Sequence, residues 1–252
     1  MELIEITSAN VEKLGYFCRM SKMKTPGNQN KVEWLKKRFS EGLKIKMFRK
    51  PERGFIEYIP GEYAWRSIRA KGYMVIHCLW VVGKSKGKDL GSILIGECIS
   101  DAKKAGMNGV AVVTSEGTWM TGRKFFQKHG FETVDRSPES FELLLHEFKT
   151  VTKPTFTGNW VDKCKKFGDG LTILKTPQCP YNEDAQDTII EVANELGISS
   201  RVIDLTSAEE VRNLSPSPYG TFNVVVDGRF FSYEYSVPKL LKKKLIEFRK
   251  GN

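Results

Sequence analysis

The sequence predicts an α+β protein with two domains. Strand-like alternation and helical spacing follow one another through residues 1–150, and a second such series runs through 170–252. Between them lies a stretch rich in Thr, Gly and Lys with no sustained period. A chain of 252 residues is long enough for each half to bury its own core. We therefore predict domains at 1–150 and 170–252, joined by a linker at 151–169.

The first domain is predicted to be a mixed sheet with helices on its faces. The segment TPGNQN at 25–30 is predicted to interrupt the helices. In the long apolar strand, Cys78 is expected to point away from His77 and into the core. The predicted elements are a strand at 3–6, helices at 11–20 and 32–43, strands at 44–50, 54–67 and 73–82, a helix at 90–105, a strand at 109–115, a helix at 122–130 and a strand at 141–148.

The second domain is predicted to be a smaller α/β unit. Its terminal helix carries the run Lys242–Lys244, which we interpret as the solvated face of an amphipathic helix. The predicted elements are strands at 171–175 and 201–205, helices at 184–197 and 207–214, a hairpin at 222–235 and a helix at 238–250.

The net charge of +10 is concentrated in the first half. Residues 1–150 hold 26 Lys/Arg against 17 Asp/Glu, whereas residues 151–252 hold 14 against 13. Such a balance suits a polyanionic ligand, either a nucleic acid or a phosphorylated cofactor, and solvated basic surface is the alternative. We favour the cofactor over nucleic acid.

Cysteine and histidine usage favours neither disulfides nor a metal site. The five cysteines are widely spaced without a C-x-x-C pair, and there are three histidines. No apolar run reaches the roughly 18 residues of a membrane helix, and the start lacks the pattern of a secretory signal. We therefore expect a cytoplasmic protein with no metal and no membrane association.

The segment KSKGKDLGS at 84–92 predicts a phosphate-binding loop. It follows the long apolar strand and opens a predicted helix, where backbone N–H groups lack intrahelical partners and the helix dipole is positive. Glycine allows close approach of a phosphate, and Lys84, Lys86 and Lys88 strengthen the field. Taken alone, an ordinary basic loop would explain the same letters.

The surrounding order of elements resembles the GNAT N-acetyltransferase superfamily. The family's loop pattern, Gln/Arg-x-x-Gly-x-Gly/Ala, falls on residues 86–91, and its aromatic–x–x–x–Gly–Phe signature falls on Phe126 to Phe131. The resemblance covers residues 2–148. With the second half included, the layout looks like that of the YoaP-type acetyltransferases. Three positions depart from the family pattern: Lys86 replaces the usual Gln or Arg, Asp89 stands at a loop glycine, and Phe126 stands where many members have a tyrosine acid.

The resemblance implies transfer of an acetyl group from acetyl-CoA to a small-molecule or peptide amine by direct attack. It implies that pantetheine lies along the backbone of the apolar strand and that pyrophosphate sits on the loop amides. The implied cofactor-binding residues are Leu79, Trp80, Val81, Val82, Lys86, Gly87, Lys88, Asp89, Leu90, Gly91 and Ser92.

An attacking ammonium must lose a proton, and His77 is a candidate base on the apolar strand. A hydrogen-bonded core histidine is the alternative for His77. Glu116, after the next strand, is the second catalytic candidate. The acceptor would be bound by Glu57, Tyr63, Trp65 and Trp119, which ordinary sheet surface or aromatic packing would also explain.

The second domain contains TPQCPYN between a strand and a helix, which resembles the Cys-Pro-Tyr-Cys site of thioredoxin-like glutaredoxins. Cys179 would lie just ahead of a helix, where a thiol becomes more nucleophilic. Asn182 stands in place of the second cysteine, so no resolving thiol is present. Two alternatives to an active acetyltransferase remain: a weakened CoA-binding or regulatory protein, which Asp89 and Phe126 motivate, and a monothiol glutaredoxin-like protein that uses Cys179.

Overall fold

The computed structural model describes residues 2–117 and 119–251. The chain divides into two compact units, and each is described by itself. Unit 1 comprises Met1–Lys24, Val32–Ala64 and Ile68–Phe156. Unit 2 comprises Thr25–Lys31, Trp65–Ser67 and Thr157–Asn252.

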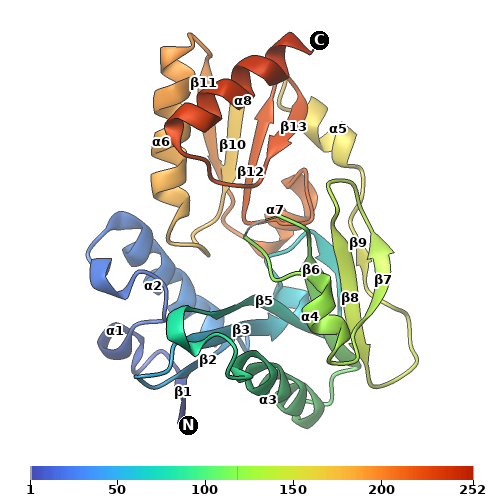
Figure 1. The fold of residues 1–252 in the computed structure, drawn as a ribbon. Coiled ribbons are helices and arrows are strands. Elements are labelled where there is room, and N and C mark those ends of the chain that lie inside the picture. Colours follow the sequence, from blue (N-terminus) through green and yellow to red (C-terminus); the bar gives the residue numbers. More distant parts are fainter. Residues whose placement is uncertain (1, 118, 252) are drawn as a thin grey trace. The chain divides into compact units, whose positions relative to one another are not determined.

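Unit 1 is built on a mixed sheet in the order β1-β2-β3-β5-β6-β8-β7 (Figure 1). Its pairs are antiparallel, except that β5 and β6 run parallel and are connected through α3. A short ribbon of β4 and β9 accompanies this sheet. The strands are β1 (Leu3–Ile6), β2 (Lys44–Phe48), β3 (Gly54–Pro60), β4 (Ile68–Arg69), β5 (Met74–Val81), β6 (Gly109–Thr114), β7 (Glu132–Arg136), β8 (Glu142–Glu147) and β9 (Thr155–Phe156).

The helices of the first half of the chain are α1 (Val11–Leu14), α2 (Pro26–Phe39), α3 (Leu90–Lys104) and α4 (Arg123–Gln127); all belong to unit 1 except the part of α2 up to Lys31, which belongs to unit 2. Helix α3 packs across β3, β5 and β6. Its buried side chains Leu94, Ile95 and Cys98 meet sheet residues that include Tyr58 and Ile76. This cluster is the core that fixes the start of α3 beside the end of β5.

Two N-terminal helices differ from the sequence prediction. Helix α1 ends at Leu14, because Gly15 adopts a positive φ of 72° and Phe17 one of 86°. Helix α2 begins at Pro26, within the segment predicted as a break. Proline at the first helical position has no N–H to lose, and the carbonyl of Thr25 accepts from the N–H groups of Asn28 and Gln29 at 3.0 Å each.

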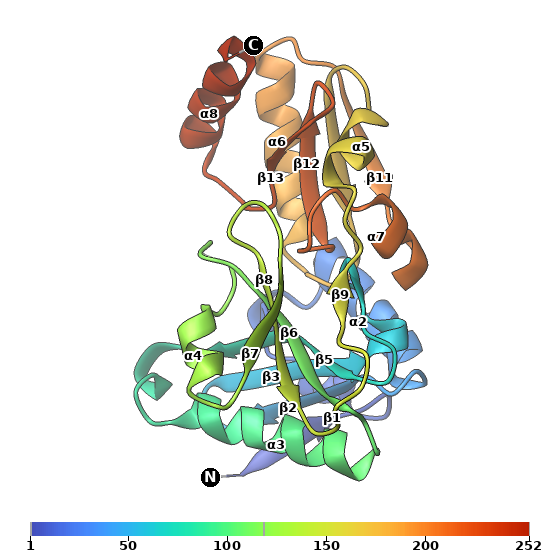
Figure 2. The same cartoon turned by 90° about the vertical axis from the view of Figure 1, so that its right-hand side faces the viewer.

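Strand β7 was not predicted from the sequence. It is an edge strand whose side chains are partly or fully exposed and include several charges, so it lacks clear alternation. Figure 2 shows β7 beside β8 as a hairpin. The hairpin turn places Arg136 and Glu142 at the same end of the two strands, where they face each other in the register.

Unit 2 contains a sheet in the order β11-β10-β12-β13, with β10 parallel to β11 and antiparallel to β12. Helix α6 packs on β10, β11 and α8. Helix α5 lies in the stretch predicted to be a linker. The elements are α5 (Trp160–Lys165), β10 (Leu171–Lys175), α6 (Asn182–Glu195), β11 (Ser200–Asp204), α7 (Ala208–Leu214), β12 (Phe222–Val226), β13 (Arg229–Ser232) and α8 (Pro238–Lys250).

Two short segments from the first half of the chain are part of unit 2. The Arg66 guanidinium donates to Gln178 Oε1 at 3.1 Å, and the Ser67 hydroxyl donates to the Val211 carbonyl at 3.2 Å. Gly27 lies so close to Pro180 that an added Cβ would be 2.3 Å from its carbonyl oxygen. The sequence gives no local signal for these contacts, because each joins residues far apart in the chain.

A buried charge cluster holds α3 to the sheet in unit 1. Asp101 Oδ2 accepts from the Tyr58 hydroxyl at 2.7 Å and from the ammonium groups of Lys44 and Lys46 at 2.9 Å each. Burial by itself raises the pKa of Asp101, but these hydrogen bonds outweigh it and lower the pKa to about 2.

This cluster predicts a specific loss of stability in acid. Because the folded pKa of Asp101 lies below its ordinary value of 3.8, its contribution is fully present above about pH 4 and disappears as the pH falls to about 2. We expect Asp101→Asn to reduce the free energy of unfolding of unit 1 by about 2 kcal/mol at pH 7 and by much less near pH 2. Urea unfolding across this range measures the difference, and a difference that does not depend on pH would contradict the assignment.

Candidate functional site

Strands β5 and β6 are paired only along the first part of β5. Their parallel pairing covers Met74 to Ile76 opposite Val110 to Val112, whereas β5 continues to Val81 and β6 to Thr114. On the side facing β6, the backbone of β5 beyond Ile76 therefore has no strand partner among the described residues. Backbone polar groups require partners, so this gap can receive an extended polar ligand.

A β-bulge lies at the point where the two strands separate. Glu57 pairs with Cys78 and Tyr58 pairs with Ile76, so His77 is the additional residue in β5. The bulge shifts the alternation by one residue: Met74 and Ile76 face α3, and so do Leu79 and Val81. The prediction that Cys78 is a core residue is therefore wrong, since its side chain is exposed. His77 keeps the parity of Val75 and loses that of Leu79.

The bulge brings His77 against Glu57. The His77 Nδ1 lies 3.2 Å from Glu57 Oε1, and both side chains are buried, with exposures of 0% and 3%. The Trp34 ring lies beside the imidazole, with the two ring centroids 6.2 Å apart. The sequence indicates His77 and Glu57 as candidate site residues but does not indicate their contact, which depends on the register of β3 and β5.

A cavity of about 460 Å³ opens between the end of β5 and the start of α3. Most of the predicted cofactor residues line it: Leu79, Trp80, Val81, Lys86, Gly87, Asp89, Leu90 and Gly91. Val82, Lys88 and Ser92 were also predicted but are not among its lining residues. Ser85, Thr121 and Phe125 complete the wall and were not predicted.

The loop before α3 presents unused backbone donors to this cavity. Among the described residues, the N–H groups from Gly87 to Gly91 donate to no other group. Gly87 has a positive φ of 78°, and a Cβ added there would meet nothing within 4 Å, so the backbone is open to a ligand. Consecutive unpaired amides at a helix start form an anion site.

The three loop lysines differ in what they contact. Lys88 Nζ binds Glu52 Oε1 at 2.7 Å, and Glu52 also accepts from the Ser85 hydroxyl at 2.7 Å. These hydrogen bonds lower the pKa of Glu52. Lys88 therefore braces the loop. Lys84 and Lys86 are exposed and form no ion pair within the described residues, and Lys86 lies on the cavity wall.

Asp89 stands where the family pattern has a glycine, and its backbone conformation is one that favours glycine. Its φ of 57° and ψ of 17° are left-handed, a conformation that glycine adopts without strain and that aspartate tolerates better than most residues. The side chain accepts a hydrogen bond from the Ser92 hydroxyl and does not cap the helix. Its carboxylate remains exposed at the cavity mouth.

The aromatic residues of α4 have different surroundings. Phe126 is buried with 1% exposure and packs against Phe131 in the core, whereas Phe125 lines the cavity. Gly91 permits the approach of Phe125, since a Cβ at Gly91 would lie 2.7 Å from Phe125 Cζ. Neither phenylalanine can donate a proton.

The remaining predicted site residues are dispersed. Glu116 is exposed on the wall of a second cavity, and Trp119 and Tyr63 are 44% and 45% exposed. Trp65 is 1% exposed and belongs to unit 2, and Glu57 is buried at 2%. These two side chains are packed inside and do not form an open acceptor wall.

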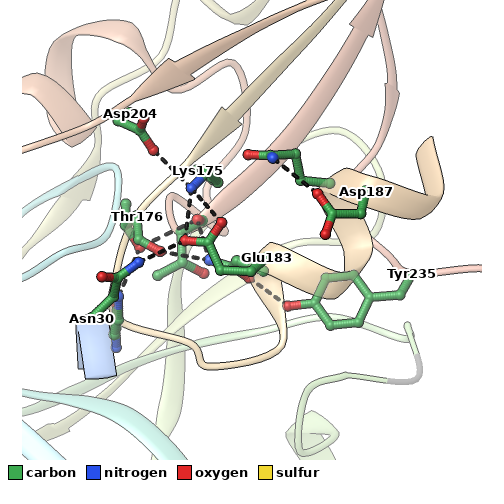
Figure 3. A network of polar contacts seen from close by, with 11 residues as sticks. Asn30, Lys175, Thr176, Glu183, Asp187, Asp204 and Tyr235 are labelled. Carbon is green, nitrogen blue, oxygen red and sulfur yellow. Dashed lines mark hydrogen bonds and ion pairs between the residues drawn. The ribbon is translucent and has the colours of Figure 1, made fainter. Parts of the chain in front are cut away.

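In unit 2, Cys179 contacts Tyr235, which is part of a polar network with Thr176 and Glu183 (Figure 3). The Tyr235 hydroxyl donates to Asn182 Oδ1 at 2.5 Å and lies 3.4 Å from Cys179 Sγ. The Asn182 amide in turn donates to the carbonyls of Thr176 and Thr221 at 2.8 and 3.2 Å. Asn182 thus fastens the helix start to β12.

Lys175 is the charged centre of the same network. Its ammonium contacts both oxygens of Glu183 at 2.8 Å and Asp204 Oδ1 at 2.9 Å (Figure 3). Burial lowers the pKa of Lys175, but these carboxylates outweigh it and raise the pKa. Within the described residues, no group of His, Cys, Asp and Glu side chains is suited to hold a metal ion, and no helix is both long and apolar enough to span a membrane.

The sequence is 32% identical over 234 residues to the uncharacterized N-acetyltransferase YoaP of Bacillus subtilis (strain 168), covering 92% of this chain and 93% of the relative. The chain belongs to the YoaP-like N-acetyltransferases. As a member of this family it is an acetyl-CoA-dependent acetyltransferase. No protein-family model matches the sequence.

Solved structures offer more distant likenesses. The ribosomal-protein-alanine N-acetyltransferase of Brucella melitensis is 16% identical, with 57% of this chain and 97% of that chain covered and a TM-score of 0.41. The PaiA N-acetyltransferase of Thermoplasma acidophilum, in complex with coenzyme A, is 17% identical, with 59% and 100% covered and a TM-score of 0.39. Because these scores are low, the family assignment rests on the Bacillus relative.

The contact between Gly91 and Phe125 yields a test of the cavity. We expect Gly91→Ala to displace the Phe125 ring and weaken acetyl-CoA binding about tenfold, since overpacking typically costs 1–3 kcal/mol. Gly96→Ala is the matched control in the same helix, because its Cβ would meet nothing within 4 Å. It should leave affinity unchanged and stabilise the helix by about 0.5–1 kcal/mol. Titration calorimetry compares the two variants, and equal affinities would place the cofactor elsewhere.

Proposed function

We propose that unit 1 transfers the acetyl group of acetyl-CoA to the amine of a small molecule or peptide by direct attack. The observation that carries this proposal is the row of N–H groups from Gly87 to Gly91 that, within the described residues, donate to no other group, beside a β5 edge with no strand partner in the same part of the chain. Together they offer donors for a pyrophosphate and a backbone edge for an extended amide chain. The family membership of the chain agrees with this chemistry.

Cofactor binding is assigned to three parts of the site. The amides of Gly87 to Gly91 and the ammonium of Lys86 would hold the pyrophosphate. The backbone of Leu79 to Val82 would bond the pantetheine arm. Thr121 now donates its hydroxyl to the Leu79 carbonyl at 3.1 Å, so it would release this acceptor when a ligand amide takes its place.

Acetyl-CoA supplies a thioester, whose carbonyl carbon bonds to the amine nitrogen as its C–S bond breaks and the electron pair leaves with sulfur. The ammonium must lose one proton to the chain before its nitrogen can attack, and the second proton, lost from nitrogen as the amide forms, goes to water. We assign acceptance of the first proton to His77, held by Glu57, because the gap between β5 and β6 begins at His77. Glu57 would fix the imidazole with Nε2 directed away from the carboxylate. Because Phe126 is buried and cannot donate, the thiolate would take its proton from water.

Unit 2 is proposed to be a thioredoxin-like domain without dithiol chemistry. The parallel β10–α6–β11 unit, followed by the antiparallel β12 and β13 and by α8, supports the fold. Asn182 supports the loss of dithiol exchange, since it occupies the second cysteine position and serves as a hydrogen-bonded fastening.

The cofactor assignment is tested by titration with acetyl-CoA. We expect binding at submillimolar concentration. We expect Asp89→Gly to tighten binding about fivefold, because it removes a negative charge near the pyrophosphate and relieves the left-handed backbone. Asp89→Asn separates the two effects, since asparagine tolerates this backbone and carries no charge. If the protein does not bind acetyl-CoA at submillimolar concentration, the proposal is wrong.

The proton-accepting role is tested with His77→Gln. Glutamine can still donate to Glu57 but cannot take the proton, so we expect kcat to fall at least about a hundredfold with little change in the KM for acetyl-CoA. Cys78→Ser, the exposed neighbour, is the control and should retain activity. Thiol release measured across a pH series provides the readout. An unchanged kcat and pH profile would assign His77 to packing alone.

A further inference from the structure

A second cavity of about 650 Å³ lies in unit 1. The end of β6, the first turn of α4 and the turn between β7 and β8 form its walls. Phe125 lines both this cavity and the one beside β5, so the two cavities share this side chain. The volume falls within the range of small-molecule sites.

One wall of the second cavity is a closed ion pair. Arg123 Nη1 binds Glu142 Oε1 at 2.6 Å, and Glu142 Oε2 accepts from the Thr133 hydroxyl at 2.6 Å. These contacts lower the pKa of Glu142. The carboxylate of Glu142 and the charge of Arg123 therefore satisfy each other and leave little attraction for a ligand.

The other charged side chains of this cavity are available. The Arg136 side chain is 72% exposed, and its Nε lies 3.9 Å from Oε1 of Glu142, its ion-pair partner among the described residues. Lys124 and Glu116 are exposed and form no ion pair in the described part of the chain. The wall thus offers cations at Arg136 and Lys124 and a carboxylate at Glu116.

The turn that carries one wall is held in an uncommon conformation. Glu139 and Ser140 have φ angles of 61° and 60°, in the left-handed region where two successive residues other than glycine are rare. The turn places the Ser140 hydroxyl to accept from the Glu116 N–H at 3.1 Å. This bond fastens the segment after β6 to the hairpin, and it fixes the backbone of Glu116 at the cavity wall.

We propose that this cavity receives the acceptor, and that the acceptor is an amine bearing an anionic group, either a carboxylate or a phosphate. Arg136, with Lys124, binds the anionic group, and Glu116 binds the ammonium. A guanidinium is suited to this because it offers two parallel N–H donors to either group. The inference rests on the proposed acetyl transfer and specifies its acceptor.

The test compares amines in matched pairs: β-alanine with β-alaninamide, and ethanolamine phosphate with ethanolamine. Acetylation is measured for the wild type, for Arg136→Gln and for Lys128→Gln, an exposed lysine that does not line the cavity. Taking the ratio of variant to wild type for each amine cancels the intrinsic reactivity of the amines. The pair that shows the larger effect distinguishes a carboxylate from a phosphate.

We expect Arg136→Gln to raise the KM of at least one anionic amine by more than tenfold, since a charge-assisted hydrogen bond is lost. The KM values of the neutral amines and of acetyl-CoA should change by less than about twofold, and Lys128→Gln should match the wild type. Equal effects on both members of each pair, or acetylation of neither anionic amine, would overturn the proposal.

A titration with CoA and dephospho-CoA tests the alternative explanation, in which Arg136 binds the cofactor and not the acceptor. If Arg136→Gln weakened CoA but not dephospho-CoA, Arg136 would serve the cofactor's 3′-phosphate and the acceptor proposal would be overturned. We expect both ligands to bind Arg136→Gln as they bind the wild type. Failure of the wild type to bind acetyl-CoA at all would refute the proposed function itself, so the two failures are distinguishable.

Discussion

Buried backbone N–H and C=O groups need hydrogen-bond partners, and this requirement determines where unit 1 can bind a ligand. Strand β5 is paired with β6 only as far as Ile76, and the edge beyond it is left for something other than a strand. The same parallel pair requires a crossover connection, which here is α3. This one connection therefore brings together the end of β5 and the start of α3, whose backbone groups lack strand and hydrogen-bond partners, respectively, among the residues that the structure describes. The cavity is a consequence of that connection.

Elements with regular local patterns are predictable from the sequence, and elements set by long-range register are not. Strand β10 and helix α3 match their periodicity, and the cavity residues from Leu79 to Gly91 are close in the chain. Thr121 and Phe125 reach the same cavity from a later segment, which no local pattern indicates. The bulge at His77 has no signature in the alternation of β5, and so the exposure of Cys78 could not be predicted.

The positive charge of the first half is only partly available to ligands. Lys44 and Lys46 neutralise Asp101, and Lys88 is held by Glu52. Lys86 is a cavity lysine that forms no ion pair within the described residues. Counting charges along a sequence therefore identifies a basic domain but overstates its field, because pairing in three dimensions removes charges that the count includes.

The composition of unit 2 has a consequence for how the protein is made. Its first residues, Thr25–Lys31, leave the ribosome long before Thr157 does, and they include Gly27, which fits against Pro180. Synthesis proceeds from the N-terminus at roughly 5–20 residues per second. These early segments must therefore wait several seconds for the rest of unit 2. Residues near the start of the chain therefore reach their partners in unit 2 only after residues near its end have been synthesised.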